Sequence, residues 1–271
     1  MKQYLDLLHK VLAEGEVRTD RTGTGTISLF GAQMRFDLSK GFPLMTTKKM
    51  FLRGLIGEML WFISGSRNAK ELEDQGINIW KQWGDPETRE MGPIYGWQWR
   101  NWHTVDDTGS KIEIVDQLQG AIDDIQDNPD SRRIIVTAWH PGQTKDMALP
   151  PCHMFFQFYV HTNGKLDLQL YVRSNDLFLG APFNIAQYAA LLMMVAKVTG
   201  KQPGTLVYTI GDAHIYSNHV EQVKEQLSRT PYDLPKLDIE GNQESIEDFK
   251  FEDFILSDYH CHPAIKAPVA V

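Results

Sequence analysis

The stretch that most constrains the fold is a Pro-Pro step directly before an aromatic segment. Pro150 and Pro151 precede Cys152 and His153, and the next residues, 154–159, have the composition of a buried strand. Proline fixes φ and donates no N–H, so the pair predicts that Cys152 lies at the entrance of a strand rather than inside its ladder. A thiol held in this way can serve as a nucleophile, although most free cysteines are small buried hydrophobes.

Composition limits the classes of protein that this chain can form. Its 271 residues are 42% hydrophobic, which is enough to bury a sizeable core. The net charge of −8 does not favour RNA or other nucleic acid, so any anionic ligand must be held by local arginines. The two cysteines, Cys152 and Cys261, have no paired spacing, which argues against a disulfide framework or a zinc site and favours a reducing cytosol.

The chain also lacks the patterns of a secreted, membrane or multidomain protein. Residues 1–6 do not form the apolar run of a signal peptide, and we expect no apolar stretch of membrane-spanning length. The sequence shows no repeat, low-complexity segment or linker. It therefore predicts a single cytoplasmic domain spanning residues 1–271.

Apolar periodicity and turn residues predict the order of helices and strands. Helices are expected over 3–13, about 50–64, 112–127 and from Asn184 to about Val198, with Asn184 in the first turn of the last one. Strands are expected at Ile27–Phe30 and Gln33–Leu38, paired around Gly31, and at 134–136, 166–172, 206–210 and near 250–256. Thr162-Asn163-Gly164 predicts a hairpin turn before the strand at 166–172.

Glu58 lies in the middle of the apolar helix expected over residues 50–64. A carboxylate in a buried helix is costly unless it is paired, hydrogen-bonded or used in chemistry. The sequence leaves two interpretations open, a structural salt bridge with Arg53 and a functional acid or base.

A dense group of tryptophans surrounds this region: Trp61, Trp80, Trp83, Trp97, Trp99 and Trp102. Broken by glycines and prolines, such a segment can line the site of a flat ligand, or it can form ordinary core.

Arginines occur at positions where an anion could bind. Arg21 precedes Gly23 and Gly25 in a loop, Arg132-Arg133 opens a predicted strand, and Arg173 follows another. Arginine forks suit phosphate, but a flexible hairpin loop and a solvated surface pair are the commoner interpretations.

Five motifs carry a resemblance to a known family. In chain order they are Arg21-Thr22-Gly23-Thr24-Gly25, Leu149-Pro150-Pro151-Cys152-His153, Arg173-Ser174 with Asp176, Phe178-Leu179-Gly180 with Pro182-Phe183-Asn184-Ile185, and His214-Ile215-Tyr216-Ser217-Asn218-His219. Together they resemble thymidylate synthase of the folate-dependent, cysteine-using type, over Met1 to Val271.

The resemblance implies an α/β (α+β) domain whose large mixed, mainly antiparallel sheet is flanked by helices. It implies a homodimer formed by sheet-to-sheet stacking and the methylation of dUMP to dTMP. The co-substrate 5,10-methylenetetrahydrofolate would give both carbon and hydride, leaving dihydrofolate, and no metal is implied.

The resemblance also assigns roles to residues. Cys152 would add to C6 of uracil, and nearby arginine charge would lower its pKa. Glu58 would be the general acid or base, with Tyr95 and His153 nearby. Asn184 would read the base, because its amide can accept from N3–H and donate to O4, which favours dUMP over dCMP.

The remaining roles concern the phosphate, the ribose and the folate. By resemblance, the phosphate would be held by Arg21, Arg173 and Ser174 of one subunit with Arg132 and Arg133 of the other, and the ribose by His214 and Tyr216. The folate would contact Lys48, Trp80, Trp83, Asp176, Leu179, Gly180 and Phe183, and Ala270 in the C-terminal lid, residues 269–271, which would exclude water.

The chain departs from the family pattern at Val172, where glutamine is usual, at Phe51, where histidine is frequent, and at His140-Pro141, in place of an asparagine-containing pair. They bear on folate affinity and nucleotide selectivity rather than on the reaction class.

Three other functions compete with the synthase. A pyrimidine nucleotide hydroxymethylase would share the fold, nucleophile and folate, with water in place of hydride. A cysteine hydrolase using Cys152 and His153 is disfavoured, because neighbours on a strand point to opposite faces. A non-catalytic nucleotide- or RNA-binding protein is the third, and the net charge opposes RNA.

Overall fold

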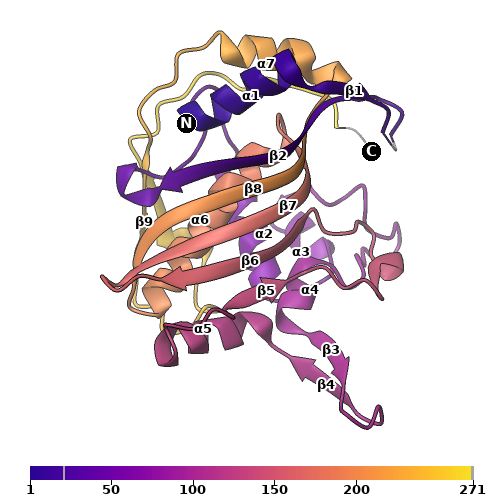
Figure 1. Ribbon diagram of the computed structural model, residues 1–271, viewed down its shortest axis with the longest axis vertical. Coiled ribbons are helices and arrows are strands. Elements are labelled where there is room, and N and C mark those ends of the chain that lie inside the picture. Colours follow the sequence, from indigo (N-terminus) through magenta and orange to yellow (C-terminus); the bar gives the residue numbers. More distant parts are fainter. Residues whose placement is uncertain (21, 270–271) are drawn as a thin grey trace.

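A six-stranded sheet forms the centre of the computed structural model, which describes residues 1–20 and 22–269 (Figure 1). In sheet order the strands are β1 (Glu16–Arg18), β2 (Thr26–Asp37), β8 (Gln202–Tyr216), β7 (Lys165–Asp176), β6 (His153–Val160) and β5 (Ile135–Thr137). Only β7 and β8 are parallel; the other neighbours are antiparallel. This confirms the expected mixed sheet in a single α+β domain.

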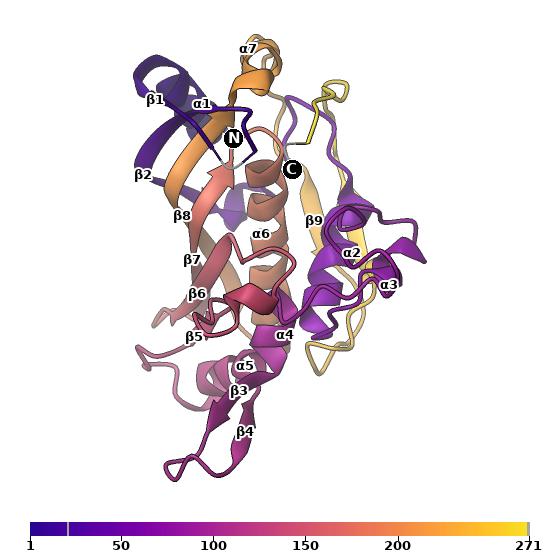
Figure 2. The same ribbon diagram turned by 90° about the vertical axis from the view of Figure 1, so that its right-hand side faces the viewer.

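Helices cover one face of the sheet. Helix α6 (Gly180–Val198) connects the parallel strands β7 and β8 and packs against both, and α2 (Leu52–Ile63) packs on α6 (Figure 2). The sequence explains this position, because α6 is apolar on nearly every side and a helix of this kind must be buried.

Contrary to expectation, α6 is by length and composition able to span a membrane. However, 72% of its apolar window is buried inside the protein, as in the core helix of a folded domain.

Shorter elements surround this core. The other helices are α1 (Lys2–Glu14), α3 (Lys70–Glu73), α4 (Tyr95–Arg100), α5 (Gln117–Asp127) and α7 (Val220–Leu227), and the small sheets are β3 (Trp102–Val105) with β4 (Ile112–Val115), and β9 (Lys236–Ile239) with β10 (Phe254–Ser257). The β3–β4 hairpin projects away from the body of the domain (Figure 1).

Several predictions are confirmed. Helices α1, α2 and α6 lie where the periodicity predicts them, and residues 162–164 connect β6 to β7 in a hairpin. Gly164 adopts φ +81°, a conformation that glycine reaches without strain.

Two predictions near β2 and α5 are wrong. Residues 26–37 form one strand that continues through Gly31 at φ +81°, because β2 pairs with β8 along its whole length instead of folding on itself. The helix expected over 112–127 begins only at Gln117, since Asp116 caps it by accepting from the Gln119 N–H at 3.0 Å. The β-branched residues before the cap form β4 instead.

Three further boundaries differ. Strand β8 runs on to Tyr216, far beyond the expected 206–210, because β2 and β7 pair with it on its two sides. The segment 251–253 is a short 3-10 turn before β10. Asn184 lies in the second turn of α6, which begins at Gly180.

Two helical glycines give a test of the packing. A Cβ on Gly96 in α4 would lie 2.0 Å from the Phe62 carbonyl oxygen at the end of α2, whereas a Cβ on Gly120 in α5 would meet nothing within 4 Å. We expect Gly96→Ala to lower the free energy of unfolding by about 3 kcal/mol through overpacking. The matched Gly120→Ala should raise it by about 1 kcal/mol through helix propensity. Urea unfolding measures both, and equal effects would contradict this packing.

Candidate active site

A cavity of about 580 Å³ opens where the central strands β7 and β8 end. It is lined by Cys152, Arg173, Ser174, Asp176, Asp212, His214 and Tyr216, with Trp83, Leu149, Pro150 and parts of the loop 18–26. At the ends of these parallel strands, Ser174 lies opposite Asp212 and Asp176 lies opposite His214. Antiparallel β6 begins there, so the pairing of three strands brings these side chains together.

Cys152 lies immediately before β6, at the strand entrance that the prolines predict. Its backbone N–H donates to the Tyr95 hydroxyl at 3.0 Å, and its carbonyl accepts from the Arg173 N–H at 2.9 Å. The β6–β7 register shifts between His153 and Phe155, a bulge of the kind that re-aims side chains next to active sites.

The Arg173 guanidinium holds the segment before the nucleophile. Its Nε donates to the Pro151 carbonyl and its Nη2 to the Pro150 carbonyl, both at 2.9 Å. The same Nη2 lies 3.9 Å from the Cys152 sulfur, and the guanidinium stacks over Trp139. The prolines thus present two carbonyls to the arginine while offering no competing N–H.

The charge of Arg173 lowers the pKa of the Cys152 thiol, as expected, but the net shift is upward. Burial raises the pKa of Cys152, and the Arg173 charge offsets only part of that effect. The resting side chain is therefore a thiol whose proton must leave before it can attack.

Glu58 is buried on α2, where Trp80 Nε1 donates to its Oε1 at 2.5 Å and Gln187 Nε2 donates to its Oε2. Burial raises its pKa to about 7, against the effect of these two donors. The salt bridge with Arg53 is wrong: that guanidinium lies over the Phe251 ring, and among the described residues Glu58 forms no ion pair.

His153 and Tyr95 form an aromatic pair behind Cys152, with ring centroids 4.7 Å apart. The His153 Nδ1 lies 3.2 Å from the Tyr188 hydroxyl, and burial lowers the pKa of His153 to about 3, so its ring is neutral. Cys152 lines the cavity while His153 is buried in the core, which places the two side chains in different environments.

Asn184 lies in the interior, with its Oδ1 accepting from Asn175 Nδ2 at 3.1 Å. Its Nδ2 donates to Gln187 Oε1 at 3.4 Å. Asn175 separates the two cavity-lining residues Ser174 and Asp176 on β7, so Asn184 is one side chain removed from the strand that forms the cavity wall.

His214 and Tyr216, which also line the cavity, lie at the end of β8 beside β7. His214 Nδ1 lies 3.1 Å from Asp212 Oδ1, which also accepts from the Ser28 hydroxyl at 2.8 Å. These hydrogen bonds hold the pKa of the Asp212 carboxyl below its usual value.

Some of the residues expected to contact folate line the cavity, and others are buried behind it. Trp83 lines the cavity, whereas Trp80 is buried and donates to Glu58. Lys48 is buried against Phe178, whose carbonyl accepts from its Nζ, and burial lowers the pKa of Lys48 to about 7. Asp176 accepts from the N–H groups of Phe178 and Leu179 just ahead of α6, the helix whose first residues include Gly180 and Phe183.

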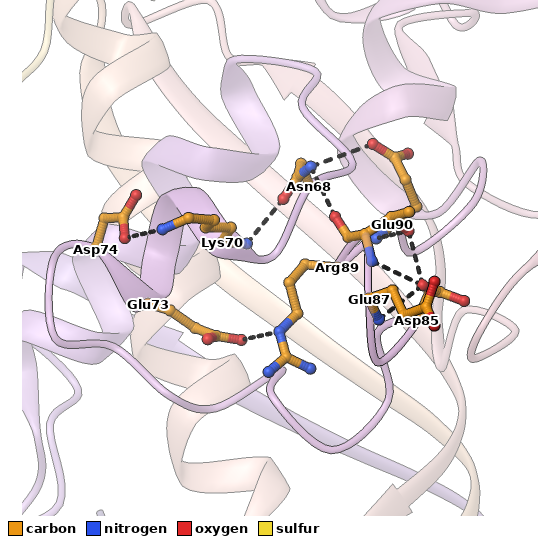
Figure 3. A network of polar contacts seen from close by, with 9 residues as sticks. Asn68, Lys70, Glu73, Asp74, Asp85, Glu87, Arg89 and Glu90 are labelled. Carbon is orange, nitrogen blue, oxygen red and sulfur yellow. Dashed lines mark hydrogen bonds and ion pairs between the residues drawn. The ribbon is translucent and has the colours of Figure 1, made fainter.

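A network of polar contacts stabilises the segment that carries both tryptophans (Figure 3). Arg89 pairs with Glu73 at 3.3 Å, and Asn68 donates to the Thr88 carbonyl at 3.2 Å. Asp85 accepts from the N–H groups of Glu87 and Thr88, closing the turn after Trp83. These contacts join residues that precede the two tryptophans to residues that follow them, which closes the loop that carries them.

The remaining predicted residues are the two arginines ahead of β5 and two residues that the structure does not describe. Arg132 and Arg133 are exposed ahead of β5, and neither lines the cavity of its own chain. Arg21 and Ala270 lie outside the described residues.

Asn175, Gln187 and Asp212 are parts of the site that the sequence did not predict. A signal existed for two of them. Gln187 follows Asn184 by three residues, so both lie on the same side of an otherwise apolar helix, and Asn175 interrupts the Arg173–Asp176 motif. The role of Asp212 depends on the full length of β8, which the sequence did not show.

A partly exposed thiol beside an arginine, together with a buried carboxyl of raised pKa, is the arrangement expected of a cysteine-using enzyme with an anionic substrate. The chain matches the family model described as "Thymidylate synthase" over residues 2–271. It therefore belongs to the thymidylate synthase family and is an enzyme of that type, with a role in dUMP methylation and dTMP biosynthesis.

The family uses methylenetetrahydrofolate as its one-carbon donor. Within residues 1–20 and 22–269, no group of three or more His, Cys, Asp or Glu side chains could hold a metal ion.

Burial of Glu58 gives a pH-dependent prediction. Because its pKa rises from 4.5 to about 7 on folding, its contribution to stability is complete below pH 4.5 and is lost as the pH rises through 7. We expect Glu58→Gln to be more stable than the wild type at pH 8 by up to about 3 kcal/mol, and to lose this advantage near pH 4.

Urea unfolding at fixed protein concentration measures this difference. The exposed hairpin variant Glu113→Gln is the control and should show no such dependence. A Glu58→Gln difference that does not change with pH would contradict the burial argument.

Proposed function

We propose that this enzyme converts dUMP to dTMP by reductive methylation, with Cys152 as the nucleophile. The observation that carries the proposal is the position of the Cys152 thiol at the cavity, 3.9 Å from the Arg173 guanidinium. 5,10-Methylenetetrahydrofolate supplies the carbon and the hydride and leaves as dihydrofolate.

The phosphate of dUMP binds at Arg173 and Ser174, which line the same cavity as Cys152. Arg21 adds to this site, and His214 with Tyr216, at the end of the neighbouring strand β8, binds the ribose. A guanidinium group offers paired N–H donors and a positive charge to a phosphate dianion, so local arginines allow a protein of negative net charge to bind dUMP.

The Cys152 thiolate then adds to C6 of uracil. The new S–C6 bond pushes the C5–C6 π electrons toward C5 and O4, which makes C5 a nucleophilic enolate carbon. Loss of the thiol proton is required first, and the positive charge of Arg173 favours the thiolate.

Glu58 serves as the general acid and base on the C5 and O4 side. A carboxyl with a pKa of about 7 can give and take a proton near neutral pH, which supports this role. Tyr95 and the neutral His153 complete the polar surroundings of the base. Asn184 reads the base by accepting from N3–H and donating to O4.

The folate binds against aromatic side chains. Trp83 supports this placement, because it lines both the nucleotide cavity and a second cavity of about 560 Å³. Trp80, Leu179, Gly180 and Phe183 extend the surface, Asp176 contacts the pterin, Lys48 meets the glutamate tail, and residues 269–271, which include Ala270, close as a lid.

The active form is a cytoplasmic homodimer. The sheet face away from α6 supports this, because it leaves the apolar side chains Ile135, Phe155 and Tyr159 between 36% and 60% exposed. Stacking of two such faces brings Arg132 and Arg133 of one subunit to the phosphate of the other.

Replacing the nucleophile tests the proposal. We expect Cys152→Ser to abolish turnover while still binding dUMP, because a hydroxyl replaces the thiol with little change in shape. Calorimetry measures the binding. Wild-type enzyme with dUMP and methylenetetrahydrofolate should form dTMP and dihydrofolate. A hydroxymethyl product with tetrahydrofolate would instead show the hydroxymethylase, and full activity in the serine variant would refute the nucleophile.

Mixed dimers test the shared site. Cys152→Ser and Arg133→Ala subunits, each inactive alone, should regain about a quarter of wild-type activity after co-refolding, because half of the dimers then hold one intact site. The control pairs Cys152→Ser with Arg173→Ala, whose defects fall on residues of the same subunit's cavity, and should regain nothing. Equal recovery in both mixtures would contradict the contribution of Arg133 across the interface.

A further inference from the structure

Five buried side chains form a continuous line of hydrogen bonds behind the cavity. The Tyr208 hydroxyl donates to Asn175 Oδ1 at 2.7 Å, and Asn175 Nδ2 donates to Asn184 Oδ1 at 3.1 Å. Asn184 Nδ2 donates to Gln187 Oε1 at 3.4 Å, and Gln187 Nε2 donates to Glu58 Oε2. The proposed chemistry uses only Asn184 and Glu58, so Asn175, Gln187 and Tyr208 have no role in it.

The direction of this line is set at its Glu58 end. Both oxygens of Glu58 accept hydrogen bonds, one from the indole N–H of Trp80 and the other from Gln187, so Gln187 turns its N–H group toward Glu58 and its oxygen toward Asn184. Asn184 then faces Gln187 with its N–H group and Asn175 with its oxygen. Asn175, in turn, donates to that oxygen and keeps its own for Tyr208.

Each end of the Asn184 amide still has capacity for one more partner. An amide oxygen carries two lone pairs and an amide nitrogen two hydrogens, and the line uses one of each. A bound base therefore meets a donor on the Glu58 side of Asn184 and an acceptor on the Asn175 side.

This arrangement fits uracil. C4, which carries O4, is the ring neighbour of C5, so the side of the base served by Glu58 is also the O4 side. Uracil accepts at O4 and donates at N3, as the observed amide requires. Cytosine donates from its 4-amino group and accepts at N3, so it fits only the reversed amide.

We infer that Asn175 and Gln187 are positioning residues that fix the direction of the Asn184 amide, and that they thereby select uracil over cytosine nucleotides. The inference rests on the proposed function and deepens it. Because Asn175 and Gln187 are at most 4% exposed, reversing one amide obliges its neighbours to reverse or leaves buried polar groups unpaired.

Binding of dUMP and dCMP to variants tests this role, with calorimetry giving both dissociation constants. Asn175→Asp places an acceptor-only carboxylate beside Asn184, which obliges the amide to turn its N–H group toward it. We expect the preference for dUMP over dCMP to fall about tenfold or more. Gln187→Met breaks the line with nearly the same volume and should lower the preference in the same direction.

Gln226→Met is the matched control, because Gln226 is an equally buried glutamine that donates to Thr47 outside this line. It should reduce thermal stability while leaving the preference unchanged. If Asn175→Asp does not fold, Gln187→Met decides alone.

The outcomes separate the two proposals. A wild-type protein that does not bind dUMP would refute the proposed function. A wild-type protein that prefers dUMP, with an equal preference in Asn175→Asp and Gln187→Met, would overturn this inference and leave the proposed function standing.

Discussion

The guanidinium of Arg173 joins strand β7 to the two proline carbonyls ahead of Cys152. The position of the nucleophile depends on that contact, because it fixes the thiol at the strand entrance and places a positive charge beside it. The same β7 continues to Ser174, Asn175 and Asp176, so one strand presents the charge, the cavity wall and the link to Asn184. Because β7 and β8 run parallel, with α6 connecting them, their carboxyl ends and the groups that they carry lie side by side.

Burial sets the chemistry on the interior side of the cavity. It raises the pKa of Glu58 to about 7, lowers that of His153 to about 3 and raises that of the Cys152 thiol. The resting site therefore holds a protonated nucleophile, a neutral imidazole and a carboxyl poised near neutral pH. A carboxyl with such a pKa is suited to proton transfer near neutral pH.

Short sequence patterns predicted the features that depend only on neighbouring residues. The Pro150-Pro151 step predicted the position of Cys152, the Asn163-Gly164 pair predicted the hairpin, and the apolar run of α6 predicted its burial. The length of the strands and the buried hydrogen bonds depend on residues that are far apart in the sequence. Strand β8 is long because β2 and β7 flank it, and the line from Tyr208 to Glu58 joins β8, β7, α6 and α2, so no short window of sequence contains it.

Trapping the covalent adduct is the most direct test of the central claim that Cys152 attacks the pyrimidine. With 5-fluoro-dUMP the C5 position carries fluorine instead of the proton that must leave, so the reaction should stop with the base bonded to the protein. Intact-mass and peptide mass spectrometry after incubation with 5-fluoro-dUMP and methylenetetrahydrofolate should find one adduct per chain, on the peptide containing Cys152. No adduct, or an adduct on Cys261, would contradict the account.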